Sequence, residues 1–150
     1  MIKSILFSCS LLLVLAARWP LTTAPRQGIR GHTRWLSGNH MPSPGVKQAA
    51  PKGFSTTVYI FELTNLSQVI RREPAALYQS ISTRLVKKVV SDSSGYFSVR
   101  LPPGRYSLFT KKDTLFYANR FDKDNNIAPV EVLAGKMTPV DILVDYDATY

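Results

Sequence analysis

The segment from Asp92 to Phe109 constrains the fold of this chain more than any other stretch, because it alternates tight turns with strand patterns. Asp92 and Gly95 bracket a four-residue turn, in which glycine can adopt the positive φ that is sterically costly for other residues. Pro102-Pro103-Gly104 predicts a second turn, since proline presets φ and glycine can follow it. The residues between the turns alternate apolar with polar, namely Phe97, Val99 and Leu101 with Ser98 and Arg100. The segment therefore predicts a β-hairpin, which specifies architecture and not chemistry.

Further strands are predicted wherever β-branched and aromatic residues cluster between turn-forming residues. They cover residues 28–36, 56–63, 83–91, 115–121, 130–132 and 139–146. The strand at 56–63 is apolar on both faces, which indicates a central position in a sheet. In the last strand apolar residues alternate with Asp141, Asp145 and Asp147, which indicates one solvated face. About seven short strands with regular turns predict an all-β antiparallel sandwich.

Residues 64–82 have a different pattern. Asn65 and Gln68 have the spacing of a helix capping box, and Leu66, Val69 and Ile70 fit one helical turn. Pro74 would end or kink such a helix. We expect a short helical insertion followed by a loop.

The beginning of the chain predicts export. Residues 1–17 combine Lys3, an apolar run over 5–15 and the small residues Ala16-Ala17, as in a secretory signal peptide. The apolar run is too short for a membrane-spanning helix of about 20 residues, so we expect no integral membrane span. Cys9, the single cysteine, lies inside this run, where lipidation is the alternative to its removal with the signal. We predict a flexible lead over 18–27 and one domain over 28–150.

The net charge of +9 is concentrated before residue 101. Such a charge favours an anionic partner, for example lipopolysaccharide or an acidic glycan, although most surface charge is simply solvated. Nucleic acid is a poor candidate for an exported protein. The sequence also shows no recognition helix, RNA-binding aromatic motif or zinc-ligand spacing.

Three parts of the sequence together resemble the carboxypeptidase regulatory-like domain, a transthyretin-like (prealbumin-like) β-sandwich common in bacterial cell-envelope proteins. They are residues 28–45 with Met41-Pro42-Ser43-Pro44-Gly45, residues 58–61, and the hairpin at 92–108. The chain is also similar to small exported bacterial proteins of this type, in the stretches 38–42 and 118–122. The resemblance implies a non-enzymatic binding or scaffolding module in the periplasm or cell envelope, with an envelope protein or a glycan as partner. It carries no active site onto this chain.

Two histidines, His32 and His40, are available for catalysis or zinc binding. A site of either kind needs a third ligand or an oriented base, and the sequence shows neither. A degenerate transthyretin-like hydrolase at these histidines is therefore the enzymatic alternative to a binding module.

The loop at residues 122–126 is the candidate metal site. Asp122, Asp124 and Asn126 place oxygen atoms at alternate positions, as calcium-binding loops do. Ile127 and Leu133 stand where an EF-hand has glycine and a bidentate acid. The competing interpretation is a turn whose Asp and Asn side chains bond their own backbone.

Aromatic residues near the Lys111-Lys112-Asp113 turn are the candidate ligand-binding residues. Most aromatic residues of a small sandwich belong to its core. Phe109, Phe116 and Tyr117 flank this turn, so we expect them to form a sugar-stacking surface. A calcium- or glycan-binding accessory protein is thus the second functional hypothesis.

Overall fold

The computed structural model describes residues 26–42, 44–73 and 76–150. The predicted signal peptide, Cys9 and nearly all of the predicted lead lie outside the described residues. Over the described part, the chain forms strands and one short 3₁₀ helix and contains no α-helix. No helix there is long and apolar enough to cross a membrane.

Most of the described strands follow one another along the chain with short connections, and longer segments over residues 40–51 and 118–128 follow β1 and β9. Their bounds are β1 Gly28–Asn39, β2 Lys52–Gly53, β3 Thr57–Glu62, β4 Val69–Arg72, β5 Leu77–Ile81, β6 Leu85–Val90, β7 Tyr96–Arg100, β8 Gly104–Lys112, β9 Leu115–Tyr117, β10 Pro129–Val132, β11 Met137–Pro139 and β12 Ile142–Thr149.

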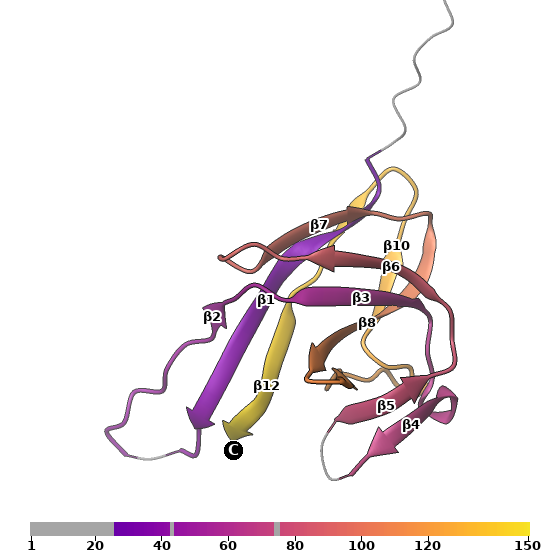
Figure 1. Cartoon of the computed structure of the whole chain (residues 1–150). Coiled ribbons are helices and arrows are strands. Elements are labelled where there is room, and N and C mark those ends of the chain that lie inside the picture. Colours follow the sequence, from indigo (N-terminus) through magenta and orange to yellow (C-terminus); the bar gives the residue numbers. More distant parts are fainter. Residues whose placement is uncertain (1–25, 43, 74–75) are drawn as a thin grey trace, which may run out of the picture.

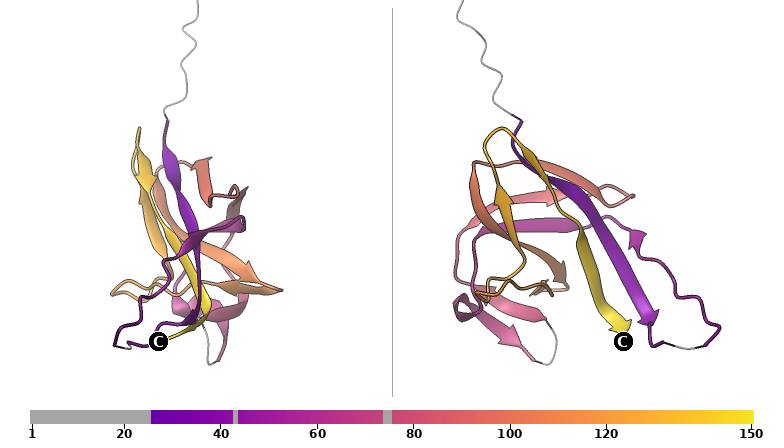
Figure 2. Two further views of the ribbon diagram at one scale, coloured as in Figure 1. Left: turned by 90° about the vertical axis from the view of Figure 1, so that its left-hand side faces the viewer. Right: turned by 180° about the vertical axis from the view of Figure 1, so that it is seen from behind.

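The strands form two sheets, which confirms the all-β sandwich. The first sheet has the order β11-β1-β12, with β2 and β7 also paired to β1. The second has the order β4-β5-β9-β8-β3-β6, with β10 paired to β8. The long strands β1 and β12 run across β3 and β6 (Figure 1), and their far ends extend beyond the second sheet (Figure 2). As expected, β3 is central, between β6 and β8.

One pairing differs from a purely antiparallel sandwich. β1 pairs in parallel with β11 and β12, whereas every other described strand pair is antiparallel. Parallel neighbours need a long crossover connection, and here residues 40–136 separate β1 from β11 and β12. The sequence pattern of a strand does not report its direction relative to a distant partner.

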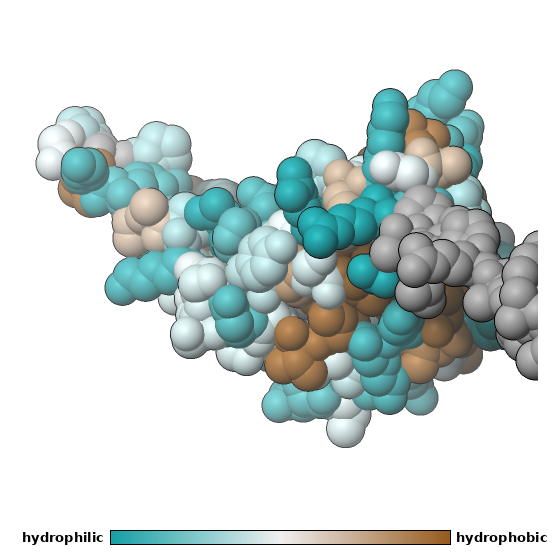
Figure 3. All heavy atoms as spheres, turned by 90° about the horizontal axis from the view of Figure 1, so that it is seen from above, coloured by the Kyte–Doolittle hydropathy of each residue, from teal (hydrophilic) through white to brown (hydrophobic). Residues whose placement is uncertain are grey.

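The main core lies between the sheets. Ile29 of β1 and Phe97 of β7 pack there with Val58 and Ile60 of β3 and Leu108 of β8. Hydrophobic residues also reach the surface as a patch on the face seen from above, where hydrophilic residues border them (Figure 3).

A second core covers the opposite face of β3 and β8. It contains Phe61, Tyr78 and Phe109, which meet edge to face at ring-centroid distances of 5.5 and 5.8 Å. β3 and β8 are therefore buried on both faces, which explains the apolar residues on both faces of β3.

The β4–β5 hairpin supplies this second core and corrects the predicted helical insertion. The capping box of Asn65 and Gln68 is present, but the 3₁₀ helix that it caps covers only Leu66–Gln68. Val69 and Ile70 then enter β4, which pairs with β5. The extended conformation wins because β5 also pairs with β9 and buries Tyr78 completely against Phe109.

Two predicted strands have different bounds in the structure. The strand expected at 115–121 ends at Tyr117, and Phe121 is 43% exposed. The strand expected at 139–146 is divided into β11 and β12, with Val140 and Asp141 between them. Both departures lie at the groove described next.

Candidate functional site

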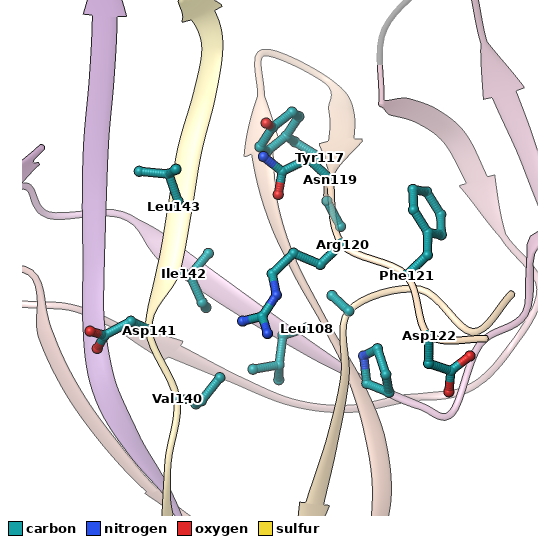
Figure 4. A pocket seen from close by; sticks show the side chains of 13 residues that line it. Leu108, Tyr117, Asn119, Arg120, Phe121, Asp122, Val140, Asp141, Ile142 and Leu143 are labelled. Carbon is teal, nitrogen blue, oxygen red and sulfur yellow. The ribbon is translucent and has the colours of Figure 1, made fainter. Parts of the chain in front are cut away.

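A groove opens between β12 and the segment that follows β9 (Figure 4). Its volume is about 200 Å³. Residues 140–143 form one wall, residues 117–122 form the other, and Leu108, Ala128 and Pro129 complete the lining. The walls come from different sheets, so the groove exists only because the sandwich brings them together.

The side chain of Arg120 extends into this groove toward β12 (Figure 4). Its guanidinium group makes no hydrogen bond or ion pair with any residue that the structure describes. The two acids of the lining have other partners. Asp141 lies 3.7 Å from Arg34 Nε and accepts a 3.0 Å hydrogen bond from the His32 amide. Asp122 accepts a 3.2 Å bond from Arg105.

The backbone around Arg120 is held on both sides. The Arg120 carbonyl accepts a 2.8 Å hydrogen bond from the amide of Ala128, and the Ala118 amide donates to the Ala76 carbonyl at 3.3 Å. The neighbouring Asn119 side chain donates a 2.6 Å bond to the Asp145 carboxylate of β12. The segment is thus positioned before any ligand arrives, which lowers the entropic cost of binding.

Asp145 joins the two sheets at one end of the groove. Its carboxylate accepts hydrogen bonds from the hydroxyl groups of Tyr117 and Tyr150 and from Asn119. Burial, and then the bond to Asp145, raises the pKa of Tyr117 far above its ordinary value. The bond to Asp145 likewise raises the pKa of Tyr150. Both phenols therefore remain protonated donors at neutral pH.

The predicted sugar-stacking surface is not exposed in the structure. Phe109 is 0% exposed and Tyr117 is 3% exposed. Phe116 is half-buried, and the Lys111 ammonium group lies 4.7 Å from the centre of its ring. Phe109 and Phe116 are covered by the β4–β5 hairpin, in the region where the sequence predicts a short helical insertion followed by a loop. Of the three residues, Tyr117 lines the groove.

The predicted calcium ligands form a turn that satisfies itself. Asp122 Oδ1 accepts from the amides of Asp124 and Asn126, both at 2.9 Å. Its Oδ2 accepts from the Asn126 side chain at 2.9 Å and from Arg105. These bonds, the Asn126 side chain first, lower the pKa of Asp122. The oxygens of Asp122 are therefore engaged within the turn and with Arg105, which is the arrangement that the competing interpretation describes.

No group of three histidine, cysteine, aspartate or glutamate side chains suited to a metal occurs in ranges 26–42, 44–73 and 76–150. His32 Nδ1 lies 3.8 Å from Asp141, and His40 Nδ1 lies 2.9 Å from Gln48 Oε1. Eight residues along extended chain separate the histidines by about 26 Å. The structure does not bring them together.

Sequence reasoning missed the groove and the position of Arg120. The signal was weak, because Arg120 follows a predicted strand and no periodicity relates it to residues 140–143. No family model, curated protein or solved structure matches this chain.

Proposed function

We propose that this chain is a non-enzymatic, exported binding module that takes an anionic group of its partner in the groove beside Arg120. Export to the periplasm or cell envelope is supported by the signal-like residues 1–17 and by the resemblance to carboxypeptidase regulatory-like domains. The observation that carries the proposal is the Arg120 guanidinium, which extends into a groove and has no acidic partner among the described residues.

A carboxylate is the anion that suits this site best. The planar guanidinium fork can donate two parallel hydrogen bonds to a carboxylate. Apolar side chains, including Leu108, Ile142 and Leu143, line the groove around this group, and Arg120 itself is exposed and accessible to a ligand. The groove volume of about 200 Å³ admits a small chemical group or a short chain segment, so only that part of the partner enters the groove.

The groove is better suited to binding than to catalysis. Neither His32 nor His40 lines it. The raised pKa of Tyr117 keeps that phenol protonated near neutral pH, which makes it a poor general base. Asp122 and Asp141, the acids of the lining, are held by Arg105 and by Arg34 with His32.

An NMR titration of the ¹⁵N-labelled protein with sodium acetate tests this function. Sodium chloride keeps the ionic strength constant. We expect NMR shifts at the Arg120 Nε–H group and at the amides of residues 120–122 and 141–143. Arg120→Gln should weaken acetate binding about tenfold or more, because it removes a charge-assisted pair of hydrogen bonds.

Arg84→Gln is the matched control, since it makes the same charge change at an arginine that is paired with Glu62 at 2.7 Å. It should leave the acetate response unchanged. Shifts that are absent from the groove, or that persist in Arg120→Gln, would contradict the proposed function.

A further inference from the structure

We propose that the groove receives the C-terminal segment of a partner protein, which adds a short strand to β12 and places its terminal carboxylate at Arg120. This inference rests on the proposed function and names the class of its partner. It depends on the free edge of β12, on the contacts that close both ends of that edge, and on the charge of Arg120.

The edge of β12 that faces the groove has unpaired backbone groups. β1 pairs with one edge of β12, and no described strand pairs with the other. The Val140 amide donates to Arg30 of β1 at 2.8 Å. Successive residues direct their N–H and C=O groups to opposite edges of a strand, so those of Asp141 and Leu143 point away from β1. Both residues line the groove, where an added strand would bond them.

Contacts between the sheets close this edge on either side of residues 140–143. On the side toward the C-terminus, Tyr117 and Asn119 bond Asp145, and Lys112 bonds Asp147 at 2.8 Å. On the other side, Thr138 Oγ1 donates to the Glu131 carbonyl of β10 at 2.7 Å. The free edge is therefore only a few residues long.

A chain end fits this window better than a continuous strand. A strand that continued in both directions would meet the closing contacts, whereas a terminus can stop inside the groove. The terminus also supplies a carboxylate, and Arg120 reaches toward residues 140–142, at the start of β12 (Figure 4). Backbone bonds to Asp141 and Leu143, together with one carboxylate–guanidinium pair, then account for every unpaired group named above.

Hydrogen exchange with a synthetic peptide tests the inference. The probe is acetyl-Thr-Val-Thr-Val with a free C-terminal carboxylate, and its control is the same peptide with a C-terminal amide. At a peptide concentration ten times its dissociation constant, the amides of Asp141 and Leu143 should exchange about tenfold more slowly. Those of Ile142 and Val144, which face β1, should change much less. The amidated peptide should bind about tenfold or more weakly.

Two variants separate the backbone contact from the side-chain contact. Leu143→Pro removes the N–H group that points away from β1, a change that an edge strand tolerates. It should abolish the slowing of amide exchange by the peptide. Leu143→Ala keeps the N–H and should bind within a few-fold of the wild-type protein. If Leu143→Pro fails to fold, the alternating exchange pattern of the wild-type protein still decides the question.

The outcomes distinguish this inference from the proposed function. If acetate binds at Arg120 but the peptide leaves Asp141 and Leu143 unprotected, strand addition is wrong and the proposed function stands. Equal binding of the free and amidated peptides, or tighter binding of an amidated peptide with an internal glutamate, overturns the terminal-carboxylate assignment. If acetate itself does not bind, the proposed function is wrong as well.

Discussion

Two buried threonines show that the partners of a side chain, rather than its type, decide its contribution to stability. Thr33 is 0% exposed, and its hydroxyl group bonds the Phe54 carbonyl at 2.6 Å and Ser91 Oγ at 2.9 Å. Thr110 is 1% exposed, and its Oγ1 has no hydrogen-bond partner among the described residues. A buried hydroxyl without a partner loses its hydration and gains nothing in return.

Replacing each threonine by valine should therefore have opposite consequences. We expect Thr110→Val to leave the free energy of unfolding unchanged or to raise it by about 1 kcal/mol. Thr33→Val should lower it by about 1–3 kcal/mol, because the Phe54 carbonyl and Ser91 lose a buried partner. Urea unfolding followed by circular dichroism measures both. Equal losses in the two variants would show that the Thr110 hydroxyl group is bonded after all.

At the scale of elements, one turn geometry occurs twice. In residues 92–96, the Gly95 amide donates to the Asp92 carbonyl and the Asp92 amide donates to the Tyr96 carbonyl, both at 2.9 Å. In residues 122–126, the Asn125 amide donates to the Asp122 carbonyl and the Asp122 amide donates to the Asn126 carbonyl, both at 3.1 Å. Gly95 and Asn125 have φ values of 85° and 61°. The turn at residues 92–96 and the predicted calcium loop thus share one turn geometry. The hairpin predicted over residues 92–108 is wrong, however, because β7 pairs with β1 in the first sheet and β8 pairs with β3 in the second.

Gly95 is required for the position of its turn as well as for its conformation. A Cβ atom at Gly95 would lie 2.2 Å from the Thr33 carbonyl oxygen of β1, so the turn between β6 and β7 would have to move away from β1. We expect Gly95→Ala to lower the free energy of unfolding by about 3 kcal/mol, from left-handed strain and overpacking together. Thermal or urea unfolding gives this value.

Gly135→Ala is the control, because Gly135 has a φ of 71° and nothing lies within 4 Å of its added Cβ. It should lower the free energy of unfolding by only about 1 kcal/mol. Losses of the same size at both positions would mean that the β6–β7 turn does not press against β1.

Residues 64–82 show the limit of local patterns at this scale. The capping box was predicted correctly, since Asn65 and Gln68 interact across three residues. The conformation of Val69 and Ile70 depends instead on pairing with β5, and that of β5 on pairing with β9. An apolar spacing that fits one helical turn also fits a short strand that covers a second core.

At the scale of the whole molecule, aromatic and carboxylate contacts hold the two sheets together beside the groove. Tyr146 of β12 meets Trp35 of β1 at 4.9 Å and Tyr117 of β9 at 5.0 Å between ring centroids. The Tyr117 hydroxyl group also bonds Asp145. Alkaline conditions should therefore act on the sandwich as a whole, through ionisation of Tyr117.

The direction of this pH effect follows from the raised pKa of Tyr117. An unfolded tyrosine ionises near pH 10, whereas Tyr117 in the folded protein stays protonated to higher pH. Its contribution to stability is complete below about pH 10 and is lost as the pH rises through the folded-state pKa. Tyr117→Phe should make the alkaline decline of the unfolding free energy less steep. It should also lower stability at pH 7 by about 1–3 kcal/mol, because a bond to a carboxylate is lost.

Urea unfolding at a series of pH values from about 7 to 11 measures this effect. Tyr96→Phe is the control, since Tyr96 is 42% exposed on β7 and has no such bond to Asp145. An alkaline decline that is equally steep in the wild-type protein and in Tyr117→Phe would show that Tyr117 does not carry it.

The sequence by itself determined those features that depend on residues a few positions apart. The turn from Asp92 to Gly95, the capping box at Asn65 and the alternation in most strands are of this kind, because φ preferences and short-range hydrogen bonds decide them. The structure decided the parallel pairing of β1 with β12, the burial of Phe109 and Tyr117, and the groove at Arg120. Each of these depends on which distant segments become neighbours, and that is settled by the burial of apolar surface over the whole chain.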